Sequence, residues 1–268
     1  MDIYCTTIKY YKVMDRLPNY IKPLGLGDVK YPKKWLNEKS EKNISNLNKY
    51  YAEFTGFYWI WKNRLSNLKD DDLIGNCHNR VLWLNKFKHN KSKLTTKSLF
   101  SNLLKLDNKI LKKIDVIQVQ PITFKNKNLL QDFKEVHKCD ALEKSLEFFP
   151  DNIANDFLEH LKGKKMYPHN MFITKKKFFI NYCNIIFPWL EKCLRYCQEN
   201  NLCKDYNTRL PAFLAERFTS FWFSKFNNRE LLSYARLGDF HLSNKFNFFL
   251  NTTKIPCTYY QFPTIHKF

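Results

Sequence analysis

Apolar residues recur along this chain with two spacings, and these spacings predict its helices and strands. From Lys49 to Leu65 they recur at every third or fourth position, which is the helical period, with Glu53 inside the segment. Short stretches rich in β-branched and aromatic residues predict strands at 3–8, 73–78, 115–119 and 170–173, with a short extended piece at 21–24. Further helices are predicted within 98–113, 129–161, 175–200 and 210–223.

Prolines mark boundaries within this pattern. Pro150 is expected to break the helical segment 129–161, because proline lacks the backbone donor of a helix. For the same reason Pro188 is expected to kink the helix 175–200 or to divide it in two. Pro211 fits the first turn of the last helix, where that donor is not needed.

The alternation of elements predicts the fold class. Strands alternate with helices up to residue 226, which is typical of an α/β domain with a mostly parallel central sheet. Residues 227–268 are polar, rich in asparagine and without a clear period. We therefore expect a single domain over 1–226 and a C-terminal extension over 227–268 that packs on its core.

Composition narrows the class of protein. The chain has 268 residues, of which 44% are hydrophobic and 17% aromatic, so it has the apolar surface needed to fold. No apolar run approaches the roughly 20 residues that cross a bilayer, and the first residues begin a strand pattern rather than a signal peptide. None of the eight cysteines forms a Cys-x-x-Cys pair. We expect a cytoplasmic protein with reduced cysteines.

The net charge of +20 raises the question of an anionic partner. A field of this sign attracts anionic membrane surfaces, nucleic acids and phosphorylated small molecules. The abundance of lysine and asparagine is also typical of an AT-rich genome, in which case the charge says little about function. No zinc-finger, helix-turn-helix or RNP signature is present, so no specific nucleic acid is predicted. Neither a Gly-x-Gly-x-x-Gly nor a Walker loop occurs, so a classical dinucleotide or P-loop site is not supported.

Polar side chains stand where two predicted strands end. Thr6 is near the end of the first strand, and His78 and Arg80 follow the strand 73–78. Ligands of open α/β sheets bind at the carboxyl ends of the strands, so these side chains are expected to share one crevice. Glu53 is expected either to face that crevice or to form a structural pair with an arginine, because an unpaired buried carboxylate is costly.

Six segments, in this order, resemble one protein family. They are IYCTT at 3–7, NIS at 43–45 followed by YYAEFTGFYWIWKN at 50–63, IGNCHNR at 74–80, DVI at 115–117, NMFI at 170–173, and Arg209 through FLAER at 213–217. With these segments the chain resembles a bacterial glycosyltransferase family first catalogued as a domain of unknown function. That family occurs in capsule, exopolysaccharide and lipopolysaccharide loci and includes galactofuranosyltransferase-type enzymes.

The resemblance implies a GT-A-like fold and a transfer reaction. A UDP-sugar would be the donor, a glycan or lipid-linked molecule the acceptor, and the transfer would invert the anomeric carbon. Arg80 would meet the donor diphosphate with His78 beside it, and Glu216 would take the proton from the acceptor hydroxyl. The other residues implied to contact substrate are Thr6, Glu53, Thr55, His169, Asn170, Arg209 and Arg217.

The metal requirement is left open by this resemblance. Many GT-A enzymes hold Mn²⁺ or Mg²⁺ with an Asp-x-Asp motif, but none ends the strand 73–78. Asp70, Asp71 and Asp72 precede that strand and are expected to form a solvated turn, so no metal ligand is predicted. Cationic side chains could take the place of the metal.

Two departures from the family pattern suggest an alternative. Asn79 replaces a tyrosine and Val81 replaces a second arginine. A catalytically degenerate protein that only binds a nucleotide sugar is therefore the rival interpretation. For Glu216 itself, the alternative to catalysis is a structural pair with Arg80 or Arg209. A basic nucleic-acid-binding protein is a further alternative. For the transferase, a lipid-linked acceptor implies peripheral binding to an anionic inner-membrane surface.

Overall fold

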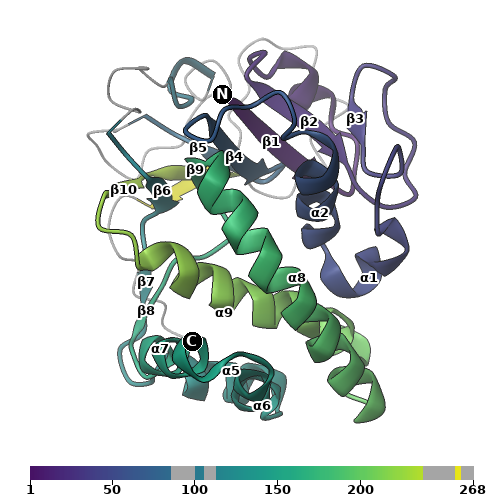
Figure 1. The fold of residues 1–268 in the computed structure, drawn as a ribbon. Coiled ribbons are helices and arrows are strands. Elements are labelled where there is room, and N and C mark those ends of the chain that lie inside the picture. The colour runs from purple at the N-terminus through teal and green to yellow at the C-terminus, as the bar shows by residue number, and fades with distance from the viewer. Residues whose placement is uncertain (86–99, 106–112, 238–256, 261–268) are drawn as a thin grey trace.

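The computed structural model describes residues 1–85, 100–105, 113–237 and 257–260 (Figure 1). Its centre is a sheet built from β1 Asp2–Thr7, β2 Ile21–Gly25, β3 Leu36–Asn37, β4 Leu73–His78, β6 Val116–Val119, β9 Phe172–Lys175 and β10 Arg229–Leu232. In space the strands follow the order β10-β6-β9-β4-β1-β2-β3. Three further strands, β5 Val81–Trp83, β11 Tyr234–Leu237 and β12 Cys257–Tyr260, continue the sheet beyond β4.

Most neighbours in this central path run parallel. The pairs β1–β2, β1–β4, β2–β3 and β6–β10 are parallel, whereas β9 runs antiparallel to both β4 and β6. The predicted α/β class with a mostly parallel sheet is therefore confirmed. The register pairs Thr6 with His78, so the carboxyl ends of β1 and β4 lie side by side.

Helices cover one face of the sheet. They are α1 Asn48–Tyr51, α2 Phe54–Asn63, α5 Leu129–His137, α6 Ala141–Ser145, α7 Asp151–Leu161, α8 Lys176–Glu199 and α9 Leu210–Ser224, with short 3-10 turns η1 Lys12–Arg16, η2 Ser45–Leu47, η3 Leu146–Phe148 and η4 Asp205–Arg209. Figure 1 shows the long helices α8 and α9 crossing below the sheet, with α5, α6 and α7 gathered farther from it. A small ribbon of β7 Ile122–Thr123 and β8 Lys165–Met166 leads to that group.

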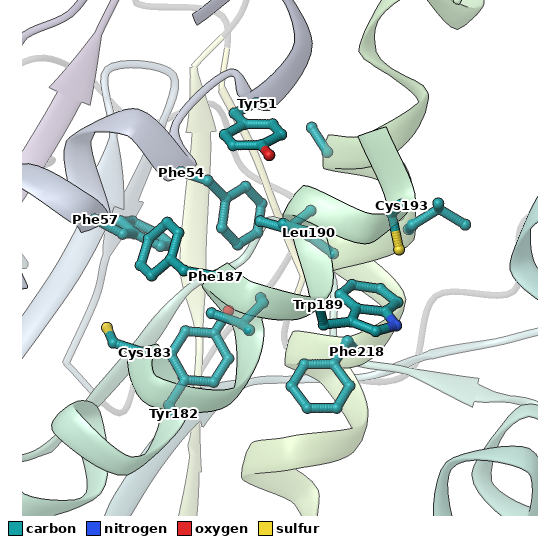
Figure 2. Packing of buried hydrophobic residues seen from close by; sticks show 14 of the residues in the cluster. Tyr51, Phe54, Phe57, Tyr182, Cys183, Phe187, Trp189, Leu190, Cys193 and Phe218 are labelled. Atoms are coloured by element: carbon teal, nitrogen blue, oxygen red, sulfur yellow. The ribbon is translucent and has the colours of Figure 1, made fainter. Parts of the chain in front are cut away.

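The core has two parts because successive side chains of a strand face opposite sides. Tyr4 points into the larger cluster under the helices, while Ile3 and Cys5 join the smaller cluster on the other face. Aromatic rings fill the larger cluster, and Figure 2 shows Phe54 and Phe187 among them. A sheet buried on both faces explains why its strands are nearly continuous apolar runs.

The predicted helix through Glu53 is wrong in one respect. The helix is interrupted at Ala52, whose φ and ψ are 48° and −126°, so Glu53 stands at the N-cap of α2 rather than inside a helix. Asn48 donates its side-chain amide to the carbonyl oxygen of Ala52 at 3.0 Å, and the Thr55 hydroxyl donates to the same oxygen. Such local bonds compete with the regular helical ladder.

Other predicted boundaries agree in part. Pro150 separates α7 from the preceding turn, as predicted, but a second break occurs at Lys138, which has a left-handed backbone with φ of 54°. The α8 helix continues through Pro188 without division. The segment 98–113 lies largely outside the described residues. None of the described helices has the length and apolarity to cross a bilayer.

The expected extension begins inside the sheet. Of residues 227–268, Arg229–Leu232 pairs parallel with β6, and Tyr234–Leu237 pairs antiparallel with β5. The first residues of this stretch are therefore strands of the central sheet rather than a layer packed on it. A domain boundary at 226 stays a prediction.

Candidate functional site

The turn His169–Asn170 is where the candidate site is assembled. It precedes β9 next to the end of β4, and its two residues have φ values of 71° and 50°. Positive φ is uncommon outside glycine and persists where surrounding contacts hold it. Four side chains, from Glu53, Asn76, His78 and Glu216, bind this turn.

His78 binds the turn from the end of β4. Its Nε2 donates to the carbonyl oxygen of His169, and its Nδ1 lies 3.1 Å from Oγ1 of Thr6. Thr6 is itself buried. Both ring nitrogens of His78 are thus occupied by protein groups, which differs from the expected contact of His78 with the donor diphosphate. The imidazole instead positions the His169 carbonyl.

Asn170 connects β4 to Glu53. The side chain of Asn76 donates to the carbonyl oxygen of Asn170 at 2.6 Å and accepts from the amide of Phe172 at 3.0 Å. The side chain of Asn170 donates to Oε1 of Glu53 at 2.7 Å. Glu53 is therefore held by an amide, and within the described part of the chain no arginine pairs with it.

Glu216 reaches the same turn from α9. Its Oε1 accepts a hydrogen bond from the amide of His169 at 2.8 Å. Removal of the carboxylate from water raises the pKa of Glu216 above its ordinary 4.5, and the negative charge of Glu53 adds to the rise. Arg217, the His169 amide and His78 oppose that rise. A carboxylate with a raised pKa accepts a proton more readily, as a general base requires.

Two predicted site residues, Thr55 and Arg209, make no contact with this turn among the described residues. Thr55 is buried in α2, where its hydroxyl accepts from Asn48 at 2.9 Å. Arg209 is exposed before α9, with its guanidinium 5.1 Å from the centre of the Phe213 ring.

Arg217 is a core residue rather than a substrate-binding one. Its Nη2 lies 2.8 Å from Oδ2 of buried Asp132, and its Nη1 contacts the sulfur of Met166. The side chain joins α9 to α5, because a buried cation needs a partner of opposite charge. Arg80, in contrast, is exposed in the turn between β4 and β5.

Asn76 is the site residue that the sequence analysis missed. It anchors the His169–Asn170 turn, yet it lies within a strand and was assigned no role. A signal was available, because an amide in the otherwise apolar strand β4 must find hydrogen-bond partners when buried. Away from this turn, the sequence analysis also assigned no role to Glu38, a fully buried carboxylate that accepts from the amide of Gly27 at 2.6 Å.

Oxygen donors for a divalent cation exist at this edge of the sheet. Glu53 and Glu216 are the carboxylates at the turn, and Mg²⁺ commonly binds through one or two carboxylates together with substrate phosphates. Asp70 and Asp71 lie at the opposite end of β4, where they pair with Lys176 and Lys177. In the described residues no group of three His, Cys, Asp or Glu side chains could hold a metal alone.

Comparison with known proteins places the chain in a family. Residues 2–228 match the family described as a domain of unknown function, DUF4422. The chain belongs to the DUF4422 family. This DUF4422 chain is similar in structure to WbbM, a bifunctional glycosyltransferase solved in its apo form, with a TM-score of 0.64 and 19% sequence identity.

The structural match covers 87% of this DUF4422 chain and 44% of the WbbM chain. No protein of curated function matches. The expected membership of a family catalogued as a domain of unknown function is confirmed, and the fold is shared with a glycosyltransferase. All the residues that bind the His169–Asn170 turn lie inside the matched region.

Proposed function

We propose that this DUF4422 protein is a glycosyltransferase that moves a sugar from a UDP-sugar to a glycan or lipid-linked acceptor in surface polysaccharide biosynthesis. The observation that carries the proposal is Glu216, a carboxylate of raised pKa fixed at the carboxyl edge of a mostly parallel sheet. Ligands of such sheets bind at that edge. The shared fold with a glycosyltransferase and the family resemblance support the same reaction.

In the proposed reaction Glu216 is the general base. The acceptor oxygen attacks the anomeric carbon, a new carbon–oxygen bond forms, and the bond to the donor phosphate breaks with its electron pair leaving on UDP. The acceptor proton passes to Glu216. Since Oε1 is held by the His169 amide, Oε2 is the oxygen that takes the proton. One displacement inverts the anomeric configuration.

Glu53 and His78 position this base rather than react. Asn170 links Glu53 to the turn, and His78 holds the carbonyl of the same turn. The turn then presents the His169 amide to Glu216. We assign the donor diphosphate to Arg80, whose exposed guanidinium group lies next to the end of β4.

The decisive experiment replaces Glu216 with glutamine. Glu216→Gln keeps an oxygen that can accept from the His169 amide but removes the base, so we expect kcat to fall about 10²- to 10⁴-fold. Release of UDP from a panel of UDP-sugars with glycan acceptors, with and without Mn²⁺, measures the loss. The matched control is Glu191→Gln, which removes an exposed carboxylate on α8 and should not change the rate. Full activity in Glu216→Gln would contradict the role of base.

The rival function is nucleotide-sugar binding without transfer. Val81, which stands where the family pattern has a second arginine, is buried in β5 and offers no charge to a ligand. A degenerate protein would bind UDP but release no product with any acceptor. Calorimetry with UDP beside the transfer assay separates the two functions.

A further inference from the structure

A hollow lies at the end of α9 that is farther from η4. Its volume is about 450 Å³, within the range of ligand pockets, and its lining includes His160, Lys164, Lys165, Tyr167, Ser224 and Arg229. These residues come from α7, the β8 segment, α9 and the first position of β10. None of them was among the site residues predicted from the sequence.

The hollow has an excess of positive charge. Lys164, Lys165 and Arg229 line it against the single carboxylate of Glu159, and Glu159 pairs with Lys162 at 2.7 Å. Within the described residues, neither Lys165 nor Arg229 has a carboxylate partner. A basic hollow whose one carboxylate is already paired attracts an anion of matching size.

Arg229 is oriented rather than loose. Its Nη1 donates to Oε1 of Gln118 at 3.0 Å, and the guanidinium lies 4.7 Å from the centre of the Tyr167 ring. These two contacts fix the plane of a group that has five N–H donors. A planar, oriented guanidinium can bind a phosphate with two parallel hydrogen bonds.

The hollow lies beside the same helix, α9, as the candidate site. Ser220, one turn after Glu216, accepts from the amide of Tyr167 at 2.9 Å, just as Glu216 accepts from the amide of His169. Ser224 lines the hollow one turn farther on. Eight helical residues span about 12 Å, which is the separation along α9 between Glu216 and Ser224.

We propose that this hollow binds the phosphate or diphosphate group of the acceptor, while the acceptor's sugar lies at Glu216. The assignment to the acceptor rests on the proposed transferase function, whereas anion binding does not. The donor diphosphate is expected at the end of β4, beside Arg80. The hollow is thus a second phosphate site.

The test measures binding of inorganic diphosphate, an alkyl diphosphate and UDP to the full chain by calorimetry. Lys165→Gln is the first variant, because this exposed side chain has no partner in the described residues and its loss should leave the fold unchanged. Arg229→Gln is the second. Each substitution should weaken the binding of both diphosphates about ten-fold, as the loss of one charged hydrogen bond does, and leave UDP binding unchanged. The matched control is Lys204→Gln, an exposed lysine next to η4.

Several outcomes would overturn the proposal. One is that neither diphosphate binds, and another is that Lys204→Gln loses as much diphosphate affinity as the two variants do. A third is that Arg229→Gln loses UDP affinity to the same extent, which would place the donor in the hollow. Binding of inorganic but not alkyl diphosphate would mean a free-anion site and remove the acceptor. Diphosphate binding in a protein that transfers no sugar would contradict the proposed function and leave the anion site intact.

Discussion

At the scale of single residues, Glu216 lowers the stability of the folded protein when its carboxylate is charged. Its raised pKa means that the folded state holds the protonated form more tightly than the unfolded chain does. The resulting stabilisation is present below the ordinary value of 4.5 and is lost as pH rises through the raised pKa. At pH values above the raised pKa the charged, desolvated carboxylate therefore weakens the fold, which is typical of active-site groups.

The direction of this pKa shift gives a prediction for the stability of Glu216→Gln. At pH values above the raised pKa of Glu216 the variant should melt at a higher temperature than the wild type, because glutamine carries no charge to desolvate. Each unit of raised pKa corresponds to about 1.4 kcal/mol. At a pH below 4.5 the advantage should vanish, since Glu216 is then protonated in both states. Thermal melts of both proteins across this range measure the difference, and an advantage independent of pH would contradict it.

A second residue-scale prediction concerns Arg80. Its exposed position predicts that Arg80→Ala leaves the melting temperature of the free protein nearly unchanged. If Arg80 binds the donor diphosphate, UDP binding should weaken by about 1.5 to 3 kcal/mol, the range for a hydrogen bond to a charged group. Calorimetry measures the affinity. Unchanged UDP affinity would end the assignment, and a large loss of stability would make Arg80 a structural residue.

At the scale of elements, helix α8 contains an unusual proline. Pro188 lies inside the helix, exposed, between the buried neighbours Phe187 and Trp189. Its ring removes one backbone hydrogen bond from the ladder of α8. The packing of the adjacent aromatic side chains against α2 and α9 offsets that loss, as the stacked rings of Phe187 and Trp61 illustrate.

Replacing Pro188 should therefore stabilise the protein. Pro188→Ala restores the missing donor without altering a core contact, and we expect the free energy of unfolding to rise by about 1 to 3 kcal/mol. Pro150→Ala is the matched control, because Pro150 is exposed at the N-cap of α7, where no helical donor is lost. Urea titrations compare the two. A destabilised Pro188→Ala would show that α8 requires a bend at this position.

At the scale of the whole molecule, the charge of +20 predicts attraction to anionic surfaces. Each basic residue near an anionic membrane contributes about 1 kcal/mol, and salt screens the contribution. We expect the protein to float with vesicles that contain anionic lipid at low salt and to dissociate as salt rises. Vesicles of neutral lipid are the control. Equal flotation with both kinds of vesicle would contradict an electrostatic attraction of the protein to anionic membranes.

The sequence by itself determined the elements and the fold class. Periodicity located β1, β4, β6, α8 and α9, because burial imposes the spacing of each element locally. The same local logic placed His78 and Thr6 at strand ends. It failed at Ala52, where side chains of Asn48 and Thr55 take the carbonyl that a helix would use.

Only the tertiary structure decided which polar groups meet. Glu53, Asn76, Asn170 and Glu216 are far apart in the chain, and one turn with two left-handed residues brings them together. The direction of each side chain also depends on packing: Arg217 turns to Asp132, while its neighbour Glu216 turns to His169. Hydrogen bonds between distant segments produce no periodic pattern in the sequence, because the partner of a buried polar group depends on how those segments are placed in the folded protein.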